Sequence, residues 1–158
     1  MKHSLRRASF RSVLWVVVAA GTLVLPAVPA RAFWHDAPDI DSGRAIYETR
    51  CASCHGAKLE GQPDWQSARE DGTYPAPPHD ETGHTWHHGD GMLRDYISRG
   101  GQAVLDDMGV DFTSGMPGFG DELTEDDIEA VLAYIRSTWP DRIRAAQSDR
   151  SLLEAGAP

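Results

Sequence analysis

The chain has 158 residues and a formal net charge of −9, from 15 basic and 24 acidic side chains. A strongly acidic protein is repelled by nucleic acid and by anionic membrane surfaces, so the composition argues against both as partners. The negative charge suits a partner with a basic surface. Alternatively, it only keeps the protein soluble.

The first 32 residues differ from the rest, because they contain five basic side chains and no acidic one. The apolar run VLWVVVAAGTLVL covers residues 13–25, and Ala30 and Ala32 follow it. A basic start, a short apolar run and an A-x-A pattern predict a secretory signal peptide over residues 1–32, cleaved after Ala32. The run is shorter than the roughly 20 residues that span a membrane, so we expect no stable membrane anchor after cleavage.

Cleavage would leave residues 33–158, with 10 basic and 24 acidic side chains and a formal charge of −14. This length is enough for one compact domain with one core.

The first helix of this domain is predicted from about Asp41 to Ala52. Asp41 or Ser42 can cap its N-terminus, and a cysteine motif closes it. Gly43 and Tyr47 are four residues apart and therefore share a face. A glycine inside a helix costs stability relative to alanine, unless another backbone comes close at that position.

Both cysteines of the chain lie in CASCH, Cys51 to His55. A disulfide between them would close almost no loop and would constrain little. A structural zinc site usually needs a second pair of ligands, and a thioredoxin-like site needs a preceding buried strand where a helix is predicted here. C-x-x-C-H is the attachment signature of c-type haem. We therefore predict one covalent haem c on Cys51 and Cys54, with His55 as an iron ligand.

Four histidines follow within ten residues: His79, His84, His87 and His88. They could form an ordinary polar loop, bind copper or zinc, or supply an alternative axial ligand, and the polar loop is favoured. Trp86 lies among them. Its indole N–H could donate to a haem propionate, or its ring could pack at the haem edge.

A second helix is predicted from about Gly91 to Arg99, with Asp90 as its N-cap and Gly100 as its C-cap. Its apolar face consists of Leu93, Tyr96 and Ile97.

The loop SGMPGFG, Ser114 to Gly120, offers a second iron ligand. Met116 stands between Gly115 and Pro117, which is a poor setting for a core side chain but leaves its thioether free to approach a metal. Met92 and Met108 are weaker rivals. Phe119 is expected to pack near the haem edge beside this loop.

A third helix is predicted after Thr124, because acidic residues occupy its first turn and apolar residues then recur at helical spacing as far as Ile135. Pro140 ends it. We expect residues 141–158 to form a frayed helix or a loose polar tail. No run with strand periodicity is convincing, so the predicted fold class is all-α.

Together, CASCH, SGMPGFG and the segment LTEDDIEAVLAYIRS resemble the class I c-type cytochrome family over residues 39–139. The stretch YPAPPHDETGHTWHH is similar to one in exported bacterial cytochromes of the mono- and dihaem group. A single CxxCH motif implies a monohaem member. The resemblance implies three main helices and long loops wrapped around one covalently attached haem, with His55 and Met116 as axial ligands.

The resemblance also implies contacts around these ligands. In this family the C-terminal helix crosses the first helix, which would explain Gly43. A backbone carbonyl near a proline holds the proximal histidine, and Pro75, Pro77 and Pro78 are the candidates here.

These features predict a signal peptide over residues 1–32, a cytochrome c domain over residues 33–140 and a tail over residues 141–158. The expected function is that of a periplasmic one-electron carrier, not an enzyme. A subunit of a dehydrogenase or oxidase complex is an alternative, as is a haem protein in which Met116 leaves the iron and a ligand binds.

The expected partner is a redox protein with a basic docking surface. Acidic residues crowd the stretch just after the Met116 loop, where the family exposes its haem edge. These residues are Asp121, Glu122, Glu125, Asp126 and Asp127.

Overall fold

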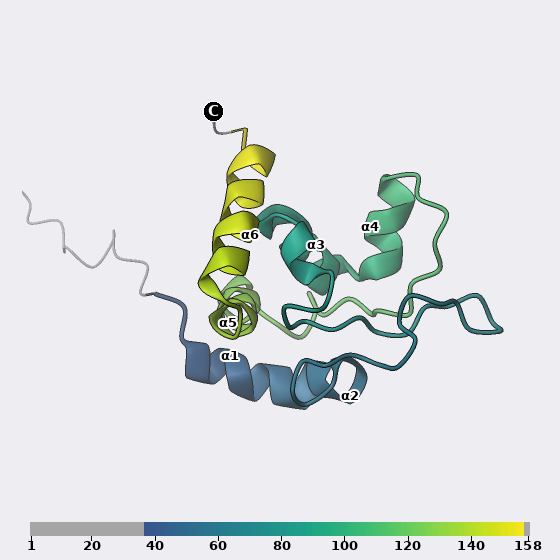
Figure 1. Cartoon of the computed structure of the whole chain (residues 1–158), viewed down its shortest axis with the longest axis horizontal. Coiled ribbons are helices and arrows are strands. Elements are labelled where there is room, and N and C mark those ends of the chain that lie inside the picture. The colour runs from purple at the N-terminus through teal and green to yellow at the C-terminus, as the bar shows by residue number, and fades with distance from the viewer. Residues whose placement is uncertain (1–36, 157–158) are drawn as a thin grey trace, which may run out of the picture. The chain divides into compact units, whose positions relative to one another are not determined.

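A computed structural model describes residues 37–156 of the chain (Figure 1). The predicted signal peptide, residues 1–32, lies outside the described residues. Among those described, no helix is long and apolar enough to cross a membrane.

The described residues form helices joined by long loops, as the predicted all-α class requires. The α-helices are α1 (Ile40–Ile46), α2 (Ala52–His55), α3 (Asp90–Arg99), α4 (Gly101–Asp107), α5 (Glu125–Ser137) and α6 (Asp141–Glu154). A π-helical turn, Tyr47–Cys51, joins α1 to α2, and a 3-10 turn covers Thr85–His87. No strand occurs in this part of the chain, and the one β-bridge, between Thr73 and Thr113, is isolated.

The cysteine motif closes the first helical run, as predicted, but the run ends at His55 and not at Ala52, because the π-helical turn carries it on through α2. The N-cap is Asp39, not Asp41 or Ser42 as predicted. Its carboxylate accepts from the backbone N–H of Asp41 at 3.0 Å and from the Ser42 hydroxyl at 2.7 Å. Asp39 caps the helix because its side chain reaches a free N–H group of the first turn.

Helix α5 begins at a capping box, in which Thr124 and Asp127 each accept from the other's backbone N–H. It crosses α1 at Gly43, where an added β-carbon would lie 1.9 Å from the carbonyl oxygen of Ala130. The predicted close approach of a second backbone at Gly43 is thus confirmed. It lets two helices meet with almost no side chain between them.

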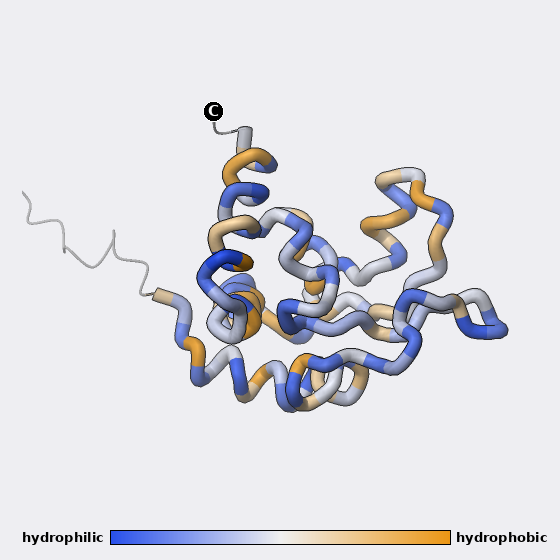
Figure 2. Tube along the Cα trace, in the orientation of Figure 1, coloured by the Kyte–Doolittle hydropathy of each residue, from blue (hydrophilic) through white to orange (hydrophobic). Residues whose placement is uncertain are grey.

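The core lies mainly between the first helical run and α5. Tyr47 is fully buried, and it packs in one cluster with Leu59, Val131, Tyr134, Ile135, Trp139 and Ile143. Figure 2 shows hydrophobic segments along α5, while the loop between α2 and α3 is largely hydrophilic. Burying one large apolar side chain contributes about 1.5–3 kcal/mol, so this cluster ties the first helical run, α5 and α6 together and anchors the loop at Leu59.

Helix α3 is capped by another part of the chain. Gly89, not Asp90, is the N-cap residue, and it has no side chain to donate or accept. The carboxylate of Glu154 accepts from the N–H groups of Gly91 and Met92 at 2.9 and 2.8 Å. Gly100 ends the helix with a φ of 86°, as predicted.

The segment after Pro140 is therefore not a loose tail. It forms α6, the yellow helix of Figure 1, whose Ile143 and Gln147 are buried. Gln147 donates to Asp90 at 2.7 Å and to the carbonyl of His88 at 3.3 Å. The polar sequence of α6 hides this role, because its contacts to α3 are hydrogen bonds and not an apolar stripe.

Helix α4 was not predicted either. It is only seven residues long and starts at the second of two consecutive glycines, Gly100 and Gly101. Its buried residues Val104 and Leu105 provide too short an apolar pattern to stand out from the surrounding loop.

Candidate haem site

The two thiols lie on one helical run, three residues apart. Both are free; Cys51 is half-buried and Cys54 is exposed. Burial, reinforced by the nearby Cys54, raises the pKa of the Cys51 thiol to about 11. Residues three apart on a helix share a face, so both sulfur atoms can reach one flat ligand.

His55 directly follows, with only 7% of its surface exposed. Its Nδ1 lies 2.9 Å from the carbonyl oxygen of Pro77. A carbonyl can only accept, so Nδ1 carries the proton and Nε2 keeps a free lone pair. Burial lowers the pKa of His55, partly offset by this hydrogen bond, which favours the neutral imidazole that a metal requires.

The Pro77 carbonyl is presented by two loop segments that run side by side. The Gln62 N–H donates to Ala76 at 2.9 Å, and the His79 N–H donates to Leu59 at 2.8 Å. Gly61 allows the close approach, since its φ is 69° and an added β-carbon would lie 2.4 Å from the nitrogen of Pro78. Of the three candidates Pro75, Pro77 and Pro78, Pro77 is therefore the residue whose carbonyl holds His55.

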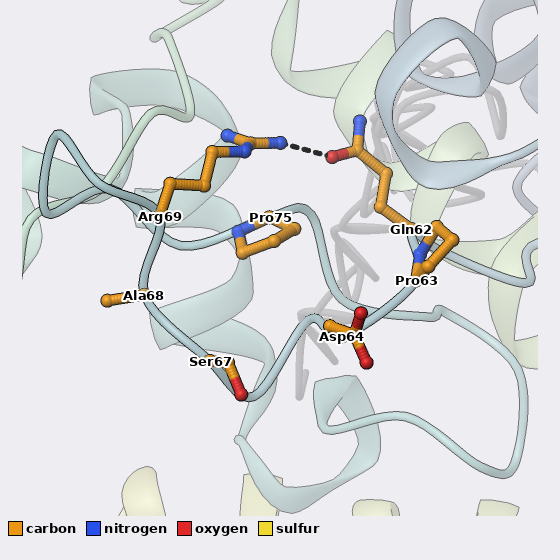
Figure 3. A pocket seen from close by; sticks show the side chains of 7 residues that line it. All are labelled: Gln62, Pro63, Asp64, Ser67, Ala68, Arg69 and Pro75. Atoms are coloured by element: carbon orange, nitrogen blue, oxygen red, sulfur yellow. Dashed lines mark hydrogen bonds between the residues drawn. The ribbon is translucent and has the colours of Figure 1, made fainter.

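The rest of the same loop encloses a pocket of about 630 Å³ (Figure 3). It is lined by Gln62, Pro63, Asp64, Ser67, Ala68, Arg69 and Pro75. Arg69 reaches across it and donates to the Gln62 side chain at 2.5 Å. No cysteine, histidine or methionine lines this pocket, so it is not the site of the thiols.

Tyr47 links the helix to the end of the motif. Its hydroxyl donates to the carbonyl of Gly56 at 2.9 Å, and its ring packs against Tyr134 with the centroids 5.5 Å apart. The backbone that carries His55 is therefore tied to α5. The sequence indicated the shared face of Gly43 and Tyr47 but not this bond.

The Met116 loop is fixed to the turn between α3 and α4 by its backbone. The Gly101 N–H donates to the Met116 carbonyl at 3.0 Å, and the Phe119 N–H donates to Ile97 at 2.8 Å. An added β-carbon on Gly118 would lie 2.7 Å from the carbonyl carbon of Arg99. The chain thus holds the Met116 backbone firmly and leaves its half-buried side chain unconstrained by these bonds.

An ion pair joins the end of this loop to the cysteine helix. Arg50, next to Cys51, lies 2.7 Å from the carboxylate of Glu122, and both side chains are about half exposed. An exposed pair of this kind contributes no more than about 1 kcal/mol, so it aligns the two segments more than it stabilises them.

The four histidines divide into two groups. His79 stacks on His55, whereas the rings of His87 and His88 lie 5.1 and 4.8 Å from the ring of His84. Within residues 37–156, no group of three or more histidine, cysteine or acidic side chains is arranged to hold a metal ion.

Two further predicted residues lie close to these segments. The Trp86 indole N–H donates to the carbonyl of Glu81 at 3.2 Å, and its ring stacks on His87 and packs against the core. Phe119 is half-buried beside the Met116 loop, where its carbonyl accepts from Glu122 and Leu123.

The family model described as Cytochrome c matches residues 40–139. The chain belongs to the cytochrome c family. No curated protein and no solved structure matches it.

This cytochrome has the donor set that a covalent c-type haem requires. Cys51 and Cys54 supply free thiols at CxxCH spacing, and His55 supplies a neutral imidazole with Nε2 free. The family and the motif together make haem c its cofactor and make the protein a haem-binding electron carrier.

Proposed function

We propose that this cytochrome is an exported one-electron carrier whose haem iron is ligated by His55 and Met116. The hydrogen bond from His55 Nδ1 to the Pro77 carbonyl carries the proposal, because it presents Nε2 as a ligand beside two thiols. The bound haem supplies a ferric–ferrous couple, and the chain supplies ligands and a surrounding of low polarity.

The Met116 loop supports the second half of the ligand set. Its backbone is held at Gly101 and Ile97, so the thioether can be presented from a rigid support. With both axial positions occupied by His55 and Met116, the iron has no open position for a substrate. This arrangement suits electron transfer and not a reaction that makes or breaks bonds in a substrate. Members of the cytochrome c family are typically electron carriers.

Export is supported by the sequence of residues 1–32, with its basic start, short apolar run and A-x-A pattern. We propose that the signal peptide is cleaved and that the carrier works in the periplasm.

The proposed partner is a redox protein with a basic docking surface. Asp121, Glu125 and Asp126 are exposed and make no ion pair with any described residue. They follow the Met116 loop directly, so they are free to meet a basic partner close to one iron ligand. Glu122 is less available, since it pairs with Arg50.

The near-infrared sulfur-to-iron charge-transfer band of the oxidised holoprotein tests the ligation. Met116→Ala should abolish the band and lower the reduction potential, because a thioether stabilises the ferrous iron. Met108→Ala is the matched control, since Met108 is 52% exposed. A band that persists in Met116→Ala, or that disappears in Met108→Ala, contradicts the assignment of Met116.

A further inference from the structure

His79 has a contact that neither the family nor the motif requires. Its imidazole lies flat against that of His55, with ring centroids 3.9 Å apart and planes 23° from parallel. The two residues are 24 positions apart in the chain, so tertiary structure and not local geometry brings the rings together.

The His79 ring is itself held firmly. Its Nδ1 shares a hydrogen bond of 2.6 Å with the hydroxyl of Thr85, a residue that is 7% exposed. Its backbone N–H donates to Leu59 at 2.8 Å, and its carbonyl accepts from the indole of the buried Trp139 at 2.7 Å. These hydrogen bonds thus hold both the ring and the backbone of His79 in place.

One hydrogen bond does not define the plane of an imidazole, because the angular preference of a carbonyl acceptor is broad. The Pro77 carbonyl fixes where His55 Nδ1 points but allows the ring to rock about that direction. A flat ring against one face of His55 removes this freedom, since aromatic rings in contact favour defined relative orientations.

We propose that His79 is a positioning residue that fixes the plane of the His55 imidazole, and through it the orientation of the axial ligand. The inference rests on the proposed function only for the role of His55 as an iron ligand. Partners of a ligating histidine orient its ring and tune the metal, and a stacked ring would do so by contact with the face of the imidazole.

Replacement of His79 separates this role from plain packing. His79→Leu keeps an apolar side chain of similar size but has no flat face, whereas His79→Phe keeps the flat face and loses the bond to Thr85. The readouts are the hyperfine-shifted haem methyl resonances and the electron paramagnetic resonance g-values of the ferric holoprotein, which depend on the axial ligand plane. His87→Leu is the control, because His87 is exposed and stacks on Trp86.

We expect His79→Leu to change the order or spread of the methyl resonances and the g-values. His79→Phe should stay close to the wild type, and so should His87→Leu. The proposal is overturned if the folded His79→Leu variant keeps the wild-type pattern, or if His79→Phe shifts it as much as His79→Leu does.

If His79→Leu does not fold around haem, His79→Gln gives the decision, because it keeps a polar group that can bond to Thr85 but has no ring. A shifted methyl pattern in His79→Gln supports the proposal, and an unchanged pattern overturns it. These spectra can be recorded whichever sixth ligand is present. A failure of the Met116 assignment is therefore distinguishable from a failure of this one.

Discussion

A β-carbon on Gly43 would lie 1.9 Å from the carbonyl oxygen of Ala130, so only glycine allows α1 and α5 to cross at this distance. The crossing places Tyr47, one turn later on the same face, at the centre of the core.

Gly43→Ala should therefore destabilise the holoprotein although alanine favours a helix. Overpacking of this kind costs about 2–3 kcal/mol, which exceeds the gain of about 1 kcal/mol in helix propensity. The free energy of unfolding in denaturant measures the balance. Ala45→Ser, on the exposed side of α1, should leave that free energy within about 0.5 kcal/mol of the wild type. If Gly43→Ala were as stable as the wild type, α1 and α5 would be able to move apart at their crossing without cost.

Glu154 is expected to stabilise α3 from the far end of the chain. Glu154→Ala removes the acceptor of the Gly91 and Met92 N–H groups, and loss of a cap costs about 1 kcal/mol. Glu154→Gln keeps an acceptor oxygen without the charge and should recover part of the loss. Denaturant unfolding of both variants, with the exposed Asp149→Ala as control, checks this. A loss in Asp149→Ala as large as in Glu154→Ala would contradict the capping role.

His88 should make the protein less stable as the pH falls. Burial, together with the neighbouring His84 and His87, lowers the pKa of His88 to about 4, against about 6.5 in an unfolded chain. Between these two values the unfolded state binds the extra proton, so stability is full above pH 6.5 and is lost as the pH falls towards 4. Because His88 is only half-buried, we expect a loss on the order of 1–2 kcal/mol.

His88→Gln should flatten this dependence between pH 6.5 and 4.5 while leaving the range from pH 7 to 8 unchanged. The free energy of unfolding at a series of pH values measures it. Asp39, Asp71 and Asp127 have pKa values lowered by hydrogen bonds, so these three carboxyl groups titrate below this window. Burial also lowers the pKa values of His79 and His87, so part of the slope should remain. A slope in His88→Gln as steep as in the wild type would show that His88 does not contribute.

The acidic residues after the Met116 loop are expected to guide the redox partner. Asp121→Asn, Glu125→Gln and Asp126→Asn together should lower the association rate and flatten its dependence on salt, because charges are screened within about 8 Å at physiological ionic strength. The reduction potential should change little. Stopped-flow electron transfer with the physiological partner across a salt series measures this.

The control replaces exposed acidic residues at the start of α1 and in α6, with Asp41→Asn and Asp149→Asn. A wild-type rate that is flat in salt, or a control that slows as much as the triple variant, would show that these acidic residues are not the docking site.

The sequence alone determined the chemistry of the site, because that chemistry depends on spacing within one helical turn. CASCH places two thiols and an imidazole together whatever the rest of the chain does, and the family confirms haem c. The sequence also indicated that a second backbone meets Gly43, because a glycine inside a helix is costly and the family resemblance implies a helix crossing there.

Only the tertiary structure decided what surrounds the imidazole. Pro77 faces His55 because two loop segments pair side by side, and His79 stacks on it because Trp139 and Thr85 hold it there. Likewise Glu154 caps α3 across more than 60 residues. Contacts of this range depend on how loops close and which helices pack, and no local pattern of residue types encodes them.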